Sequence, residues 1–138
     1  MDSLMGKPAV VLGLGVDLIE IERIKQALEA ESGKRFESRV FTEGEITYCR
    51  SKVNPYPHFA ARFAAKEAVM KAFGTGWTAR VSWKGIEVLN NELGQPFIAF
   101  HGKTEKLAGE IGVETCYISI SHNRSQAVAA ALLLGKTD

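Results

Sequence analysis

Two separate segments of the sequence hold the side chains best suited to phosphate chemistry. Asp17 ends a short apolar run, and Glu67 lies much later, in a segment that also contains Arg62, Lys66 and Lys71. Carboxylates are the hard oxygen ligands that Mg²⁺ takes, usually one or two per site, with waters and substrate phosphate oxygens filling the remaining positions. Ammonium and guanidinium groups neutralise phosphate charge. One interpretation is therefore a site for Mg²⁺ and phosphate, provided that the two segments meet in space.

Each of these charges also has a purely structural interpretation. Asp17 can be the N-cap of a following helix, with Glu20 three residues later as in a capping box. Lys66 falls in the middle of the apolar face of its own helix, where it can lay its alkyl stem on the core and keep its amine in water. Glu67 and Lys71 can form an ordinary i,i+4 surface pair. The residues alone leave both interpretations open.

The segment Phe59–Phe73 gives the strongest helix prediction, because it is rich in Ala, Lys, Glu and Met. Gly74 and Gly76 follow it and predict its end. Before Asp17, residues 10–16 predict a short buried strand. Its glycines, Gly13 and Gly15, lie on one face and leave that face bare, which indicates close approach by another backbone or a ligand. A Rossmann fingerprint is excluded, because position 18 is not glycine.

The rest of the chain alternates between helical and extended patterns. Amphipathic spacing predicts a helix that begins near Leu18, and Thr42 with Glu45 resembles a capping box that opens a later one. Further helices are expected over residues 34–40 and 104–111, strands over 83–89 and 97–100, and a β-hairpin from 116–121 and 126–134. This interleaving predicts an α+β or α/β sandwich.

Composition limits the class of protein. The chain has 138 residues, 46% of them hydrophobic, and a formal net charge of +1. These values predict a single domain over residues 1–138, with a loose start at 1–8, and argue against a general nucleic-acid binder. Two distant cysteines, Cys49 and Cys116, predict reduced thiols rather than a disulfide. No segment approaches a membrane span or a signal peptide, so no membrane partner and a cytoplasmic location are expected.

The two chemical segments together resemble a known family. Residues 13–20, GLGVDLIE, followed by Arg23-Ile24, look like the first motif of the 4′-phosphopantetheinyl transferases. Residues 62–72, RFAAKEAVMKA, resemble the second motif, W/F-x-x-K-E-x-x-x-K. The FGTG that follows and ISISH at 118–122 resemble the small bacterial holo-acyl-carrier-protein synthases of that family. The resemblance runs from about residue 10 to residue 134 and implies an antiparallel sheet packed against a long central helix.

The resemblance also implies an activity. Such enzymes move 4′-phosphopantetheine from coenzyme A to a serine of apo-acyl carrier protein, leaving 3′,5′-ADP, with Mg²⁺ as cofactor and in fatty acid biosynthesis. Carried over, Asp17 and Glu67 would ligate Mg²⁺, and Lys71 would face the reacting phosphates. Lys66 would pair locally or touch a phosphate. Glu67, or a water held near it by the metal, would accept the serine proton.

The remaining expected contacts concern the nucleotide and the protein partners. The nucleotide would be held by Arg62, Gly74, Thr75, Gly76 and His122, although each also has a plain structural or surface role. Arg23, Arg35 and Arg39 belong to a basic cluster that suits docking of an acidic carrier protein or is simply a solvated face. The resemblance implies a homotrimer with active sites at subunit interfaces. Alternative functions are a non-catalytic nucleotide-binding or assembly module, or a transferase that serves peptide or polyketide synthase carriers.

Overall fold

The structure is a computed structural model that describes residues 8–136, apart from the side chain of Thr78. Most of the expected loose start, residues 1–7, therefore lies outside the described residues. In chain order, the elements are β1 (Ala9–Glu20), α2 (Ile21–Glu29), α3 (Gly33–Val40), α4 (Glu43–Arg50), α5 (Tyr56–Phe73), the 3₁₀ helix η1 (Thr75–Arg80), β2 (Ile86–Asn90), β3 (Pro96–Phe100), α6 (Gly102–Ile111), β4 (Thr115–His122) and β5 (Gln126–Lys136).

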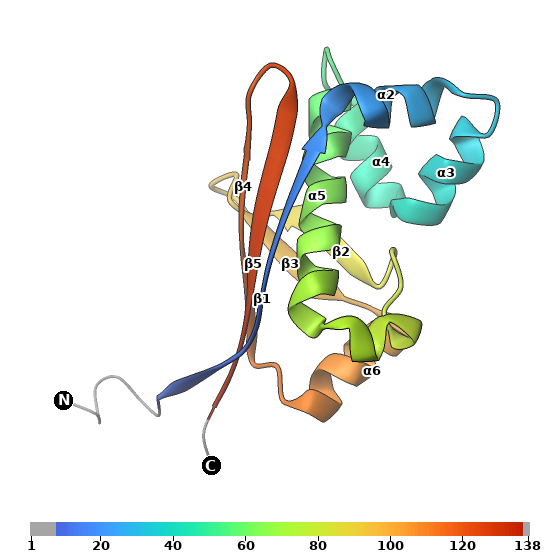
Figure 1. Cartoon of the computed structure of the whole chain (residues 1–138). Coiled ribbons are helices and arrows are strands. Elements are labelled where there is room, and N and C mark those ends of the chain that lie inside the picture. The colour runs from blue at the N-terminus through green and yellow to red at the C-terminus, as the bar shows by residue number, and fades with distance from the viewer. Residues whose placement is uncertain (1–7, 137–138) are drawn as a thin grey trace.

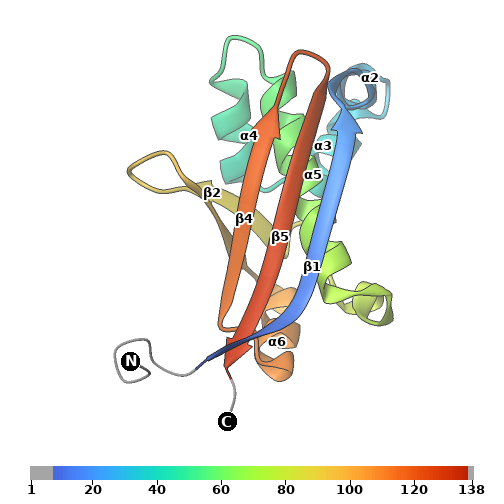
Figure 2. The same ribbon diagram turned by 60° about the vertical axis from the view of Figure 1, so that its left-hand side comes forward.

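The main layer is an antiparallel sheet with strand order β1-β5-β4, and β2 and β3 form a separate antiparallel hairpin. Helix α5 runs along one face of this sheet, with α2, α3 and α4 grouped beside its N-terminal half (Figure 1). Among residues 8–136, no helix or strand covers the other face of the sheet (Figure 2). The α+β fold with a long central helix is confirmed, and the hairpin of β4 and β5 is where the pattern predicts it.

β1 is longer than expected, and this corrects the N-cap interpretation of Asp17. The strand pairs with β5 from Ala9 through Glu20, so Asp17 lies within it opposite Ala129. The N-cap of α2 is Glu20, whose side chain makes no capping hydrogen bond. The strand continues because β5 supplies backbone partners along its whole length, which a local pattern does not reveal. The carboxylate of Asp17 is therefore not used to cap a helix.

The two glycines of β1 seat the central helix. A Cβ atom at Gly13 would lie 1.8 Å from the backbone oxygen of Ala72, and one at Gly15 would lie 1.9 Å from that of Ala68. Real side chains do not fit at such distances, so only glycine allows α5 to approach β1 this closely. The bare face predicted from the sequence is confirmed as a contact between two backbones, and it brings α5 directly over the strand that contains Asp17.

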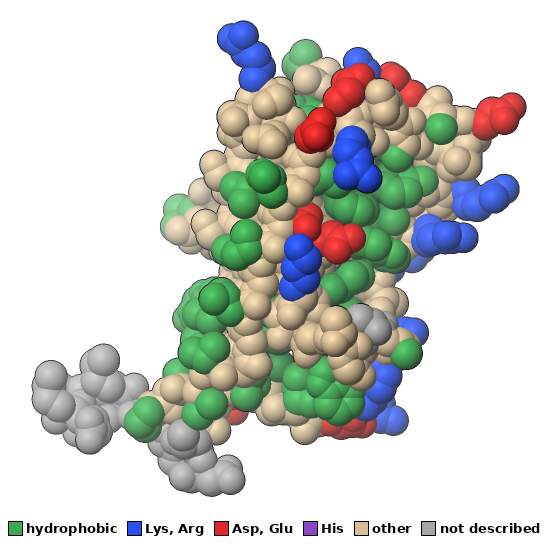
Figure 3. Space-filling view, viewed as in Figure 1, with side chains coloured by type: hydrophobic (Ala, Val, Ile, Leu, Met, Phe, Trp, Pro, Cys, Tyr) green, Lys and Arg blue, Asp and Glu red, His purple; other side chains and the backbone are tan. Residues whose placement is uncertain are grey.

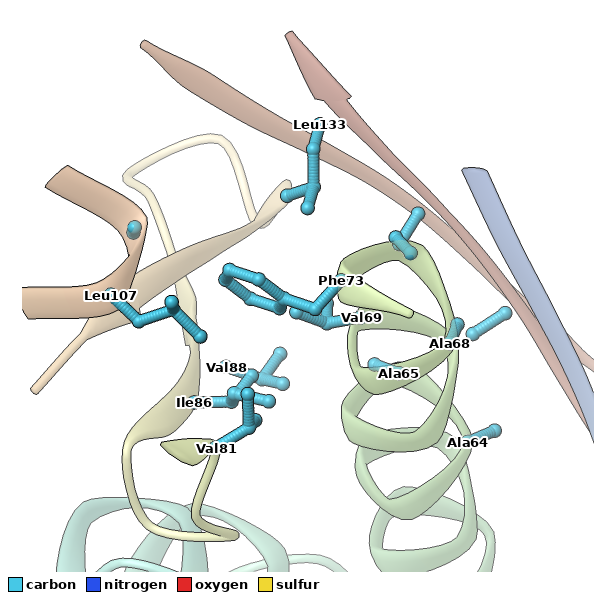
Figure 4. Close-up of a cluster of buried hydrophobic side chains, with 14 residues drawn as sticks. Ala64, Ala65, Ala68, Val69, Phe73, Val81, Ile86, Val88, Leu107 and Leu133 are labelled. Carbon is cyan, nitrogen blue, oxygen red and sulfur yellow. The ribbon is translucent and has the colours of Figure 1, made fainter. Parts of the chain in front are cut away.

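A shared core explains why α5 is buried on nearly all sides. The alanines of its C-terminal part, from Ala64 onwards, pack with Val69 and Phe73 against Leu133 of β5, Leu107 of α6 and the β2–β3 hairpin (Figure 4). A second cluster joins α5 to α2, α3 and α4, with Phe41 against Phe59 at its centre. The helix is therefore buried over more of its surface than the single apolar face predicted from the sequence, because neighbouring elements contact it from several directions.

The outward face of the sheet is apolar and exposed. Leu14, Val16 and Leu18 of β1 and Tyr117 of β4 project from it. The prediction that the first strand is buried holds for only one of its faces, since successive side chains of a strand point to opposite sides. An apolar sheet face of this extent is a typical surface for contact with another protein chain.

Both cysteines are free, as expected. Burial raises the pKa of each thiol, Cys49 and Cys116, to about 12. Neither thiol is therefore a nucleophile at neutral pH. Within residues 8–136, none of the helices has both the length and the apolar character that crossing a bilayer requires.

Candidate active site

A cleft of about 410 Å³, hereafter the β1–α5 cleft, brings the two motif segments together. Asp17 enters it from β1, Glu67 and Lys71 from α5, and Arg23 from α2. Its other wall is apolar. Acidic and basic side chains meet beside this hydrophobic surface where β1 and α5 run together (Figure 3). The apolar wall consists of Leu18, Ile19, Ile24, Ala27, Phe36 and Phe63.

Lys71 bridges the helix and the strand. Its Nζ donates hydrogen bonds to Asp17 Oδ1 at 3.1 Å and to the backbone oxygen of Val16 at 3.0 Å. The Lys71 side chain is 54% exposed, whereas that of Asp17 is 15% exposed. The lysine can therefore swing away from the carboxylate into solvent without breaking core contacts. The surface pair expected between Glu67 and Lys71 is thus replaced by one between Asp17 and Lys71.

Glu67 is half-buried in the same cleft. Its pKa lies above the ordinary value, first because burial disfavours the charged form and then because Asp17 is also negative, while Lys71 opposes both effects. Two carboxylates that repel each other at one edge of a cleft suit a divalent cation. Within residues 8–136, no group of three or more His, Cys, Asp or Glu side chains is arranged to hold a metal ion. The two-carboxylate donor set fits Mg²⁺, which draws its other ligands from water and phosphate.

Lys66 points away from the β1–α5 cleft. Its side chain is fully buried, and its Nζ lies 2.8 Å from Glu45 Oε1. It also donates to the backbone oxygens of Trp83, at 2.9 Å, and Ile86. The snorkelling interpretation is wrong, because the amine reaches a buried carboxylate rather than water. Of the two roles expected from the resemblance, local pairing and phosphate contact, this geometry shows local pairing.

Arg62 is also buried, on the side of α5 that faces β2. One of its guanidinium nitrogens donates to Asn90 Oδ1 at 2.6 Å, and the group lies 4.0 Å from the ring centre of Tyr48. Its Nε has no hydrogen-bond partner among the described residues. Arg62 is therefore neither a surface residue nor a wall of the β1–α5 cleft, and it retains one donor for a further acceptor.

The residues after α5 confirm the expected helix end. Gly74 is the C-cap with a φ of 93°, a conformation that side chains disfavour, and η1 begins at Thr75. Gly76 is exposed. Gly74, Thr75 and Gly76 thus follow Lys71 within about one and a half helical turns.

His122 ends β4 and is exposed, in a small pocket of about 140 Å³ that Leu18 also lines. Its ring centre lies 6.2 Å from that of His58. The pKa of His58 is lowered, first by burial and then by the positive charges of Lys52 and Arg62 and by His122. His58 was not predicted from the sequence, although its position four residues before Arg62 on the same helix was an available signal.

The basic residues expected to dock a carrier are separated in the structure. Arg23 lines the β1–α5 cleft, whereas Arg35 and Arg39 are exposed along α3. The aromatic contacts that support this region were not predicted from the sequence either. Phe63, on the cleft wall, stacks on Trp83 with ring centres 5.1 Å apart.

The family model for the 4′-phosphopantetheinyl transferase superfamily matches residues 13–131, which include both motif segments. The chain belongs to this superfamily. It is accordingly an enzyme, a phosphopantetheinyl transferase, as the motifs predict. A holo-[acyl-carrier-protein] synthase of Koribacter versatilis is 44% identical to the transferase over 124 residues, which cover 90% of this chain and 98% of that protein.

Solved structures of proteins named holo-[acyl-carrier-protein] synthase support the same family assignment. The crystal structure of holo-[acyl-carrier-protein] synthase from Neisseria meningitidis matches the transferase with a TM-score of 0.82 at 29% identity, covering 90% of this chain and 98% of that one. The holo-(acyl-carrier-protein) synthase from Bacillus anthracis, solved in complex with CoA (3′,5′-ADP), matches with a TM-score of 0.74 at 33% identity, covering 91% and 98%. The transferase therefore shares the fold of these synthases over nearly their full length.

Proposed function

We propose that this transferase moves 4′-phosphopantetheine from coenzyme A to a serine hydroxyl of apo-acyl carrier protein, leaving 3′,5′-ADP, in fatty acid biosynthesis. The observation that carries the proposal is the meeting of Asp17, Glu67 and Lys71, from both family motifs, in one cleft. The similarity to proteins named holo-[acyl-carrier-protein] synthase, one of them solved with coenzyme A, supports the choice of substrates.

Asp17 and Glu67 would hold Mg²⁺. The support is the chemistry of this donor set, two hard oxygen ligands whose mutual repulsion a divalent cation relieves. When bound, the metal would neutralise charge on the coenzyme A pyrophosphate. Because Lys71 is exposed beyond its contact with Asp17, its ammonium can turn towards the phosphates as their charge grows. Glu67, or a water that the metal would hold near it, is the candidate base for the serine proton, since Glu67 is the second carboxylate in the cleft.

The nucleotide would extend past the cleft towards Arg62 and His122. The unpartnered Nε of Arg62 supports a phosphate contact, because a buried guanidinium donor gains from a charged acceptor. The exposed ring of His122 lies near His58, which adds a second titratable group to this region. Gly74, Thr75 and Gly76 would approach the phosphates beside Lys71. Lys66 takes no part in binding, because its amine is enclosed.

The carrier protein would dock on the basic residues around the cleft. Arg23 stands at the cleft itself, and Arg35 and Arg39 extend the positive surface along α3. An acidic helical carrier would be steered to this surface by complementary charge. The apolar residues Ile24 and Phe36 between these arginines supply a surface that binding can desolvate.

The working enzyme would be a homotrimer. The exposed apolar face of the β1-β5-β4 sheet supports association between copies, because contact of such an apolar surface with water is unfavourable. Leu18, on this face, lines both the β1–α5 cleft and the His122 pocket. A neighbour packed there would bring its own residues to the edge of the site.

The test combines the protein with coenzyme A, Mg²⁺ and several apo-carrier proteins, and detects addition of phosphopantetheine by mass spectrometry. Glu67→Gln should leave folding and oligomer mass unchanged while lowering the rate by roughly 10²-fold or more. The control is Glu105→Gln, on the exposed side of α6, which should react as the parent does. No modification of any carrier would overturn the proposal, and preference for a peptide or polyketide synthase carrier would redirect it.

A further inference from the structure

The side of α5 opposite the glycine contact holds a second lysine–carboxylate pair, Lys66 with Glu45, here called the sealed pair. Both side chains are completely enclosed, and their charged atoms lie 2.8 Å apart. Burial holds the pKa of Lys66 below its ordinary value, and the charge and hydrogen bond of Glu45 offset that shift only in part. The pair faces no cleft, so it contacts neither the expected metal nor the substrate.

The Glu45 carboxylate joins three elements. Oε1 accepts a hydrogen bond from the backbone N–H of Thr42 at 2.8 Å, completing the capping box of α4. Oε2 accepts one from the backbone N–H of Val88 in β2 at 2.7 Å. Oε1 also meets Lys66 of α5. Since Lys66 donates in addition to the carbonyl oxygens of Trp83 and Ile86, every polar atom of the pair has a directional partner.

The two sides of α5 constrain it in different ways. Gly13 and Gly15 set how close α5 comes to β1, but they have no side chains that interlock with the helix. Such a contact by itself fixes a separation rather than a rotation about the helix axis, and the apolar clusters that surround α5 pack against it without directional bonds. The sealed pair acts from the other side, where directional hydrogen bonds favour one orientation of Lys66. Consecutive helix residues point about 100° apart, so the direction of Lys66 determines the direction of Glu67.

We propose that Glu45 is a positioning residue of the active site: through Lys66 it holds α5 at the rotation that places Glu67 beside Asp17. A buried ion pair contributes little net stability compared with apolar residues of similar volume, because desolvation offsets its attraction. An apolar pair would fill the same space without specifying a direction. The inference rests on the proposed function in that the Asp17–Glu67 site is taken to bind a divalent cation.

The test replaces both members of the pair, Glu45→Gln with Lys66→Met, so that no uncompensated charge remains. The matched control is Arg80→Gln with Glu110→Gln, which removes an exposed ion pair whose residues do not line the cleft. Binding of Mn²⁺ alone is measured by electron paramagnetic resonance, and folding by circular dichroism and thermal melting. We expect a cooperatively folded double variant whose Mn²⁺ dissociation constant rises at least tenfold, with the control unchanged.

Kinetics provide a second readout. In the double variant, kcat should fall about tenfold at saturating coenzyme A. KM for coenzyme A should stay within about threefold, because the substitutions leave the contact of Arg62 with Asn90 and the exposed ring of His122 in place. A folded double variant with parental Mn²⁺ affinity and kcat would overturn the inference. Parental Mn²⁺ binding that is insensitive to Asp17→Asn would overturn it as well.

Glu45→Asp keeps the inference testable should the double variant not fold. The substitution preserves the charge and withdraws the carboxylate by one methylene, so Mn²⁺ binding should weaken about threefold in a folded protein. Unchanged Mn²⁺ binding in that variant would count against positioning. Failure of the parent enzyme to modify any carrier would instead overturn the proposed function, and the Mn²⁺ measurements would still decide the role of Glu45.

Discussion

Two lysine–carboxylate pairs lie on opposite sides of α5 and differ almost entirely in their surroundings. The sealed pair, Lys66 with Glu45, is fully enclosed at 2.8 Å. The open pair, Lys71 with Asp17, is separated by 3.1 Å, and its lysine is 54% exposed. Each pair joins a lysine of α5 to a carboxylate from another element, Glu45 of α4 or Asp17 of β1. The comparison shows that burial, rather than the kind of charge, separates a fixed structural contact from an exchangeable one.

The loss of one partner has opposite energetic consequences in the two pairs. Breaking a buried pair by removing one partner leaves a charge with no water to solvate it, whereas water and salt compensate for the loss of an exposed partner. The open pair is therefore free to change partners during a reaction. The sealed pair is not, and it suits the support of a site rather than its chemistry.

The largest expected effect separates the two lysines directly. Lys66→Met should lower the free energy of unfolding by about 3–5 kcal/mol, because it strands the Glu45 carboxylate in the core. Lys71→Met should lower it by less than about 1 kcal/mol and instead reduce turnover by roughly 10²-fold. Urea unfolding and the carrier-modification assay measure the two quantities. Equal losses of stability would show that the distinction between the pairs is wrong.

A somewhat smaller effect is expected where the other side of α5 meets β1. Gly15→Ala places a Cβ atom 1.9 Å from the backbone oxygen of Ala68, so α5 or β1 must shift, at a cost of about 3 kcal/mol. Gly109→Ala is the matched control: nothing lies within 4 Å of its Cβ position, and it should stabilise α6 by up to about 1 kcal/mol. Thermal unfolding of the two variants should therefore shift in opposite directions.

The smallest effect concerns Glu87, at the outer edge of the sealed side. Burial raises the pKa of Glu87, but hydrogen bonds from Thr42 and His101 outweigh it and hold the pKa below its ordinary value of 4.5. A lowered folded-state pKa contributes stability above the ordinary value, and this is lost as the pH falls through the folded-state pKa.

The parent should accordingly exceed Glu87→Gln in stability by no more than about 1 kcal/mol near neutral pH. Urea unfolding at several pH values measures this difference, which should shrink in acid. A difference that grows as the pH falls would mean that the hydrogen bonds to Glu87 do not stabilise its charged form in the folded protein.

Much of the fold follows from local patterns. The capping box at Thr42, the end of α5 at Gly74 and the hairpin of β4 and β5 all occur where the residues predict them, because each depends on neighbours in the chain. The extent of β1 did not follow, because it depends on pairing with β5 near the other end of the sequence. This dependence on a distant strand is the reason that the N-cap interpretation of Asp17 was wrong.

The family, the residues of both motifs and the chemistry that they permit follow from residue type and spacing along the chain. Which charges meet depends on the folded arrangement: Glu67 and Lys71 lie with Asp17 in a cleft, whereas Lys66, one residue away from Glu67, is enclosed with Glu45. A helix turns about 100° per residue, so adjacent side chains enter different environments, and the elements packed around the helix decide whether each meets water or the core.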